Sequence, residues 1–208
     1  MFNFRKYINP VGARRRRYKK ICELVGLKPE HKILDIGAGL GESFEDFNKE
    51  NEIIAMDIRP DHKIFQDNVR NITGDATEMG FFKDKEFDLV LCVGVLEHIF
   101  PYEKLQKIAR EIARVGKSYL VIVPHMYTIF EPHHQMPFWQ LYSHKFRQFL
   151  VRHMDVAWVK KNPEGKYEEL NYFKADEWLS LFPDAKLVSY NHIFLGIIKN
   201  YIIYKKGE

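Results

Sequence analysis

The architecture of this 208-residue chain is indicated by one short stretch of sequence, Ile33-Leu34-Asp35-Ile36-Gly37-Ala38-Gly39-Leu40-Gly41. Residues 32–36 form a mostly apolar run of the length of a strand. Directly after it, glycines alternate with other residues. Glycine there lets the backbone turn tightly and approach a ligand where a Cβ atom would clash. Because ligands of open α/β sheets bind at the carboxyl ends of the strands, the stretch predicts a ligand-binding turn.

Short apolar runs and amphipathic segments alternate around this turn, which is typical of βαβ units and a parallel sheet. The apolar spacing predicts helices over 14–27, 41–49, 102–115 and 175–182. Strands are expected over 32–36, 52–57, 72–74, 87–95, 118–123, 186–190 and 193–204. The last two lie too close together for a parallel crossover, so we expect an antiparallel pair. Only about 14 residues join the second strand to the third, which leaves room for at most a helical turn or two.

The prediction is therefore one α/β domain over residues 1–208, built on a doubly wound seven-stranded sheet with helices on both faces. The sheet is mostly parallel with an antiparallel last strand. Residues 124–172 show no strand period, and we expect them to be an insertion after the fifth strand that covers the substrate as a lid. Aromatic residues recur within it at three- to four-residue spacing, which predicts the inner face of a lid helix. These are Phe138, Trp139, Tyr142, Phe146 and Phe149.

Acidic residues stand at successive strand ends. Besides Asp35, Asp57 ends the second predicted strand about 20 residues after the turn, where an acid accepts hydrogen bonds from ribose hydroxyls. Asp75 follows the third strand and can accept from the exocyclic amine of adenine, while the small Ala76 leaves room for the ring. Acids in this order indicate an adenosine-containing ligand more specifically than a glycine turn alone.

Together with Phe87–His98, these segments resemble the successive motifs of class I S-adenosylmethionine-dependent methyltransferases. The Val95-Leu96-Glu97-His98-Ile99 run is similar to the subgroup called type 11. The resemblance covers roughly residues 30–125 and implies a Rossmann-like fold, S-adenosyl-L-methionine as the cofactor and methyl transfer as the activity. It also implies a set of cofactor-binding residues. These are Asp35, Gly37, Ala38, Gly39, Gly41, Asp57, Ile58, Asp75, Ala76, Cys92 and Val93.

The main competing interpretation is a dinucleotide site of the NAD type. Its fingerprint requires a glycine at position 42, where this chain has Glu42, followed by Glu45 and Asp46. Acids in the first turn of a helix suit its dipole but repel a pyrophosphate bound there. A cationic sulfonium with a zwitterionic tail meets no such repulsion, so the sequence favours S-adenosylmethionine.

Histidines just after the fifth strand are candidates for proton transfer. His125 and His134 could each remove a proton from an acceptor atom, because imidazole titrates near neutrality. The alternative is that both are loop histidines that form hydrogen bonds and take no part in catalysis. A metal site beside Glu97 and His98 is not expected, because the second glutamate that some methyltransferases carry three residues earlier is Gly94 here.

The chain's partners are only loosely bounded. A net charge of +4 does not by itself identify a binding partner, although Arg14-Arg15-Arg16-Arg17 forms a basic run. Two cysteines, no signal-peptide pattern and no apolar stretch of about 20 residues predict a cytoplasmic protein.

We expect methyl transfer to a small-molecule or lipid acceptor. An RNA or protein methyltransferase that uses the basic run, and a non-catalytic cofactor-binding module, stay open as alternatives. No oligomeric state is predicted.

Overall fold

A computed structural model describes residues 10–41, 49–134, 136–155, 161–191 and 199–207. Seven strands form one sheet in the order β3-β2-β1-β4-β5-β9-β8. Their bounds are β1 Lys32–Ile36, β2 Glu52–Asp57, β3 Val69–Thr73, β4 Phe87–Val93, β5 Gly116–Pro124, β8 Lys186–Asn191 and β9 Lys199–Lys205. The helices are α1 Pro10–Val25, α2 Tyr102–Val115, α3 His144–His153 and α4 Ala175–Leu181, with 3₁₀ turns at Leu96–His98 and Trp139–Leu141.

The sheet is parallel from β3 to β5, and β9 runs antiparallel between β5 and β8. This confirms the predicted mostly parallel sheet with an antiparallel last strand. The central strands β1 and β4 are almost continuously apolar because both of their faces are covered. Because these strands are parallel, the carboxyl ends of β1, β2, β3 and β4 lie together at one end of the sheet, where the predicted cofactor-binding residues lie.

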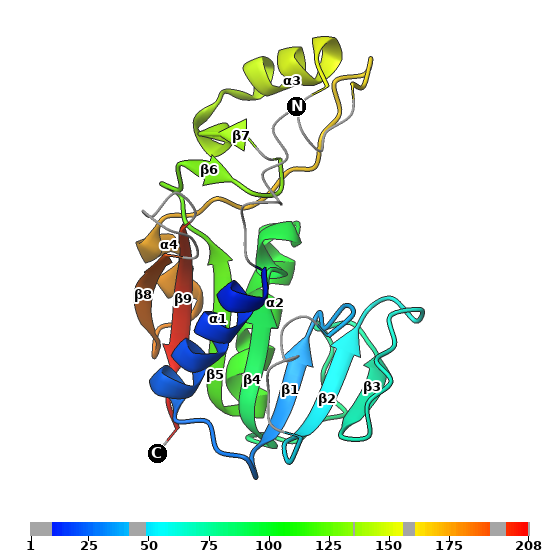
Figure 1. The fold of residues 1–208 in the computed structure, drawn as a ribbon, viewed down its shortest axis with the longest axis vertical. Helices are drawn as coiled ribbons and strands as arrows, with labels where there is room; N and C mark the ends of the chain where they lie inside the picture. The colour runs from blue at the N-terminus through cyan, green and yellow to red at the C-terminus, as the bar shows by residue number, and fades with distance from the viewer. Residues whose placement is uncertain (1–9, 42–48, 135, 156–160, 192–198, 208) are drawn as a thin grey trace.

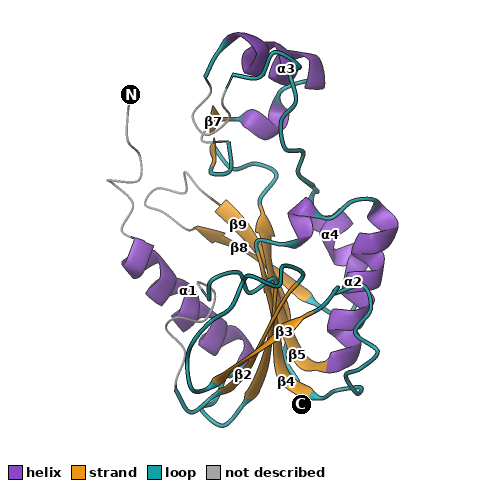
Figure 2. Ribbon diagram, turned by 90° about the vertical axis from the view of Figure 1, so that its right-hand side faces the viewer, coloured by secondary structure: helices purple, strands orange, loops and turns teal. Residues whose placement is uncertain are grey.

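Helices cover both faces of the sheet (Figures 1 and 2). α1 packs through Ile21 and Val25 against one face, while α2 and α4 pack against the other. α2 is amphipathic, with its buried residues at helical spacing. These are Leu105, Ile108, Ala109, Ile112 and Val115. Two apolar cores on opposite faces of one sheet hold the strand ends in place for a binding site.

Several element boundaries differ from the sequence-based prediction for local reasons. α1 ends at Val25 rather than residue 27 because Gly26, with a φ of +67°, adopts the left-handed conformation that terminates helices. β4 ends at Val93 rather than residue 95 because Gly94 turns the chain with a φ of +69°. The predicted helix over 41–49 and the start of the strand predicted over 193–204 fall largely outside the described residues.

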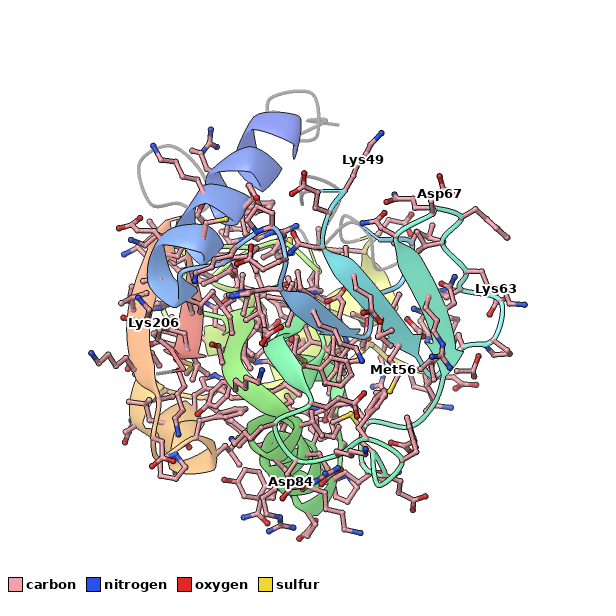
Figure 3. All side chains as sticks on the ribbon, turned by 90° about the horizontal axis from the view of Figure 1, so that it is seen from below. Lys49, Met56, Lys63, Asp67, Asp84 and Lys206 are labelled. Atoms are coloured by element: carbon pink, nitrogen blue, oxygen red, sulfur yellow. The ribbon has the colours of Figure 1, made fainter. Side chains whose placement is uncertain are left out.

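The connection between β2 and β3 contains no helix, although the sequence left room for a short one. Asn71 closes this loop, because its side-chain amide donates to the carbonyl of Ile64 and accepts from the amide of the same residue. Figure 3 shows Lys63 and Asp67 on the outside of this connection, at the β3 edge of the sheet. The ends of β2 and β3 are therefore not covered by a crossover helix.

Between β5 and α4 the chain forms a small unit above the sheet, which contains α3 and the two-residue strands β6 (Phe130–Glu131) and β7 (Met136–Pro137). This unit has its own apolar cluster around Trp139, Leu150 and Val151. The predicted aromatic stripe is wrong as the inner face of one helix, because Trp139 precedes α3 and is buried while Phe146 and Phe149 on α3 are about half exposed. The α3 N-cap, Ser143, lies between Tyr142 and Phe146 and separates the two sets.

Two further observations bear on the sequence analysis. Cys22 and Cys92 are free thiols. Among the helices that the structure describes, none is both long and apolar enough to cross a membrane.

Candidate functional site

The glycine turn after β1 is held by hydrogen bonds to the neighbouring strand. The amides of Gly37 and Ala38 donate to the carbonyl of Met56 at 2.8 and 3.2 Å. Gly37 has a φ of +69°, and a Cβ atom there would overlap the side chain of Val95. Gly39 and Gly41 also have positive φ values, of +53° and +86°. The turn therefore depends on glycine, both for its backbone conformation and for its close contact with the loop after β4.

Asp57, at the end of β2, ties this turn to the next strand. Its Oδ2 accepts from the amide of Gly39 at 2.9 Å and lies 3.3 Å from Nδ1 of His62, and its Oδ1 accepts from the amide of Arg59 at 2.9 Å. Burial would raise the pKa of Asp57, but these hydrogen bonds together lower it below its usual value. The carboxylate is therefore ionised at neutral pH. Nε of Arg59 also lies 3.5 Å from Oδ1, so a ligand hydroxyl would replace one of the two longer contacts, that of Arg59 Nε or that of His62.

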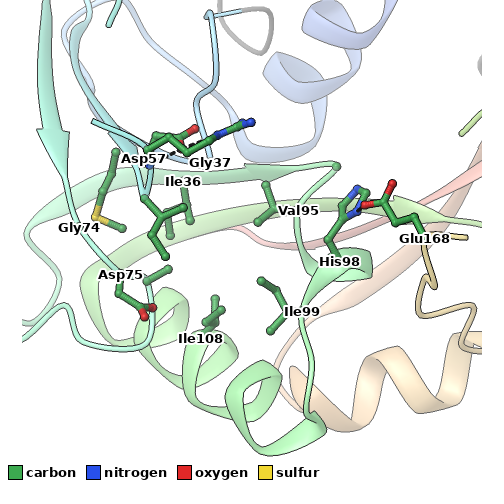
Figure 4. Close-up of a pocket in the computed structure, with 15 residues that line it drawn as sticks. Ile36, Gly37, Asp57, Gly74, Asp75, Val95, His98, Ile99, Ile108 and Glu168 are labelled. Carbon is green, nitrogen blue, oxygen red and sulfur yellow. Dashed lines mark hydrogen bonds and ion pairs between the residues drawn. The ribbon is translucent and has the colours of Figure 1, made fainter. Parts of the chain in front are cut away.

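A cavity of about 420 Å³ opens between the strand ends, within the usual size range of small-molecule sites. Five predicted residues line it: Gly37, Asp57, Ile58, Asp75 and Ala76. Asp75 is exposed to the cavity side of the β3 end, and a hydrogen bond from the amide of Thr77 lowers its pKa. Two carboxylates and the glycine turn thus face one cavity in their sequence order (Figure 4).

The loop after β4 forms the opposite wall, although not through the predicted residues. Gly94 and Val95 line the cavity there. Cys92 is fully buried in the core on the α2 face, and its burial, with the charges of Glu97 and Asp35, raises the pKa of its thiol well above the usual value. The side chain of Val93 packs on the α1 face instead. The remaining predicted residues are not among those that line the cavity; these are Asp35, Ala38, Gly39 and Gly41.

Residues 34–122 match the model of a family described as "Methyltransferase domain". Over 97 residues the chain is 36% identical to an uncharacterized protein of Methanocaldococcus jannaschii, and the match covers 46% of this chain and 42% of that protein. The chain thus spans less than half the length of this curated relative. A SAM-dependent methyltransferase of Methanosarcina mazei is similar in structure, with a TM-score of 0.59 at 17% identity over 88% of this chain and 95% of the other.

The 1,6-didemethyltoxoflavin-N1-methyltransferase of Burkholderia thailandensis, solved with bound 1,6-didemethyltoxoflavin and S-adenosylhomocysteine, is also similar. Its TM-score is 0.59 at 14% identity, over 94% of this chain and 79% of the other. The fold is that of class I S-adenosylmethionine-dependent methyltransferases. The resemblance seen in the sequence is thereby confirmed, and at these identities the solved structures show the fold alone.

At the carboxyl ends of the strands, the unit after β5 places a cluster of ionisable side chains beside the cavity. His98, in the 3₁₀ turn after β4, lines the cavity and its Nδ1 lies 2.8 Å from Oε1 of Glu168 (Figure 4). Glu97 is 2% exposed, and its Oε1 lies 3.8 Å from Nε2 of His133. Asn171 positions this turn, because its amide donates to the carbonyl of Glu97 and its side chain to that of Ile99.

Two buried glutamates in this cluster are shifted in opposite directions. Burial raises the pKa of Glu97 to about 7, since the charge of His133 offsets only part of the desolvation. Burial acts on Glu131 in the same direction, but hydrogen bonds from His133 and His134 lower its pKa to about 2. The difference follows from hydrogen bonding: Glu131 accepts on both oxygens, whereas no described residue hydrogen-bonds Oε2 of Glu97.

Neither predicted proton acceptor reaches the cavity wall. The ring of His125 stacks on Tyr201 at 4.1 Å, its Nδ1 accepts from the amide of Tyr127, and burial lowers its pKa. His134 is 2% exposed, with Nδ1 on Glu131 and Nε2 on the carbonyl of Glu168. The imidazole that does line the cavity is His98, which the sequence analysis set aside together with a metal site. The Arg14–Arg17 run lies on α1, and none of the side chains that the structure describes on this helix lines the cavity.

Proposed function

We propose that this chain binds S-adenosylmethionine in the cavity at the strand ends and transfers its methyl group to a small-molecule or lipid-type acceptor. The observation that carries the proposal is the single cavity lined in sequence order by Gly37, then Asp57 and Ile58, then Asp75 and Ala76. Asp57 would accept from the ribose hydroxyls. Asp75 would accept from the adenine amine, and the exposed side chain of Ile58 would pack on the ring.

The acceptor would enter from the side of the small unit after β5, and residues 124–172 would act as the lid. Supporting this placement, Glu168 of that unit lines the same cavity as the proposed cofactor residues. The donor sulfonium is already activated, so the protein mainly aligns acceptor, methyl carbon and sulfur and excludes water. Positioning of this kind supplies on the order of 7–11 kcal/mol in favourable cases.

Cofactor binding is tested by thermal unfolding. At a concentration one hundred times its dissociation constant, S-adenosylmethionine should stabilise the fold by ~2.7 kcal/mol, or roughly 5–11 °C in Tm for a chain of this length. Asp57→Ala should largely abolish the shift. Asp61→Ala, an exposed acid on the same loop that does not line the cavity, should retain it.

The Tm of each variant without ligand shows whether the substitution disturbs the fold itself. A flat melt with S-adenosylmethionine together with a shift on NAD would overturn the proposal. Transfer is then followed with methyl-labelled cofactor and fractionated cell extract. Label that enters RNA or protein rather than the small-molecule or lipid fraction would reject the proposed acceptor class.

A further inference from the structure

We propose that Glu97, His98 and His133 bind a divalent transition-metal ion at the acceptor end of the cavity. One ligand atom from each of these three side chains lies within 4.8 Å of the other two. Ligands about 2.1 Å from a tetrahedral ion lie about 3.4 Å apart, so binding requires only small side-chain rotations. The triad combines the two imidazoles and one carboxylate that catalytic zinc sites use, leaving a position for water or substrate.

The hydrogen bonds of both imidazoles orient them as metal ligands. Nδ1 of His98 lies 2.8 Å from Oε1 of Glu168, and Nδ1 of His133 lies 2.7 Å from Oε1 of Glu131. In each ring Nδ1 is therefore engaged by a carboxylate, which leaves Nε2 to coordinate. Carboxylate–histidine–metal arrangements of this kind fix the ring orientation and raise the basicity of the ligand.

Glu97 supplies the independent observation that points to a ligand. It is 2% exposed, and in the described part of the chain its Oε2 has no hydrogen-bond partner. A buried carboxylate oxygen without a partner costs free energy that a bound cation would recover. Gly94, which lines the cavity, has an open site beside this group: a Cβ atom there would lie 3.8 Å from Oε1 of Glu97. The buried carboxylate therefore lies directly behind a residue of the cavity wall.

The composition of the triad indicates which ion it takes. Imidazole nitrogen suits Zn²⁺ and other first-row transition ions, whereas Mg²⁺ prefers oxygen ligands and near-octahedral water. The sequence analysis expected no metal because position 94 is glycine rather than glutamate. His133 supplies a third ligand in place of the missing glutamate, and it lies 35 residues after His98 in the sequence.

If the proposed methyl transfer holds, the ion selects an acceptor with a hydroxyl group. Coordination would lower the pKa of that hydroxyl, which releases its proton to solvent. An oxygen lone pair then forms the bond to the methyl carbon as the carbon–sulfur bond breaks and S-adenosylhomocysteine leaves. This step rests on the proposed function, whereas metal binding itself does not.

The test uses the full chain after dialysis against a chelator. Zn²⁺ binding is measured by competition with a chromogenic chelator, and Co²⁺ is added as a spectroscopic probe of the ligand geometry. We expect one ion per chain, with excess Mg²⁺ failing to compete. Glu97→Gln, His98→Ala and His133→Ala should each weaken binding at least a hundredfold. Even the loss of a residue that only hydrogen-bonds a metal ligand typically lowers metal affinity roughly 10–100-fold.

Two further variants keep the test independent of folding. Glu168→Gln changes a side chain that is 65% exposed and should weaken Zn²⁺ about tenfold through His98 alone. His153→Ala removes an exposed histidine on α3 and should leave binding unchanged. Absence of stoichiometric Zn²⁺ binding, or triad variants that bind Zn²⁺ as tightly as the wild type, would overturn the site. Zn²⁺ binding without any S-adenosylmethionine-induced shift would leave the metal site standing and reject the methyltransferase proposal instead.

Discussion

The two walls of the cavity are built in different ways. The wall formed by β1, β2 and β3 consists of short local motifs, in which backbone amides of the glycine turn and the Asp57 carboxylate face one another. The opposite wall combines the turn after β4 with side chains from the unit after β5. There His98 contacts Glu168 across 70 residues of sequence, and Asn171 donates to the carbonyl of Ile99 across 72.

In the proposed function, this difference separates cofactor binding from methyl transfer. The first wall depends on backbone conformation at the ends of buried strands, and it belongs to the rigid core of the sheet. The second wall depends on a small unit whose apolar cluster is separate from the two cores of the sheet. We therefore expect the cofactor side to tolerate damage to the small unit, and the acceptor side to be lost with it.

The largest effect should follow from Trp139→Ala. Trp139 is fully buried, stacks on His134 at 4.4 Å and forms the centre of the small unit's cluster. Removal of a buried tryptophan side chain typically costs about 3–5 kcal/mol. Hydrogen exchange should show faster exchange across residues 136–155 and 161–172, with protection of β1 and β4 retained.

The cofactor should still bind to this variant if the two walls are independent. Its thermal shift with S-adenosylmethionine should resemble that of the wild type, while Zn²⁺ binding and methyl transfer are lost. Simultaneous loss of protection in β4 and of the cofactor shift would instead mean that the small unit and the sheet fold as one cooperative body.

A somewhat smaller effect is expected from Gly37→Ala on the cofactor wall. The left-handed φ of +69° costs a non-glycine residue about 1–2 kcal/mol, and overlap of the new Cβ with Val95 adds about 1–3 kcal/mol. Denaturant unfolding should therefore show a loss of about 3 kcal/mol, and the cofactor shift should disappear.

The matched control is Gly80→Ala. Gly80 is exposed, has no positive φ, and a Cβ atom there would meet no atom within 4 Å. Its stability should stay within about 0.5–1 kcal/mol of the wild type. If Gly37→Ala were as well tolerated as this control, the turn would not require glycine and the steric argument for the cofactor wall would fail.

The contrast also explains what the sequence could predict. The glycine turn, Asp57 and Asp75 were found because each is a local signal at the end of a strand, and the order of the strands places them together. Gly94 and Val95 were missed in favour of Cys92 and Val93 because a positive φ at a single glycine ends β4 two residues early. The meeting of His133 with Glu97 depends on long-range packing, for which sequence spacing carries no signal.

The smallest of the three effects concerns Glu97, where the two walls meet, and it is measured in chelator-treated protein. Its pKa of about 7 lies above the ordinary 4.5, so the folded state binds this proton more tightly than the unfolded state does. Glu97 therefore lowers stability progressively as pH rises from about 4.5 to above 7. Glu97→Gln removes this titration, and its stability relative to the wild type should improve by about 2 kcal/mol between pH 5 and pH 8.

Glu111→Gln on α2 is the control for this pH dependence. Hydrogen bonds from Arg114 lower the pKa of Glu111, so its contribution is already complete above its unfolded pKa and is lost only in acid. The stability difference of this variant should therefore be constant from pH 5 to pH 8. If the Glu97→Gln difference were equally constant, Glu97 would already be ionised at pH 5. Its carboxylate would then be satisfied by the protein itself, and the strongest argument that it awaits a metal ion would be removed.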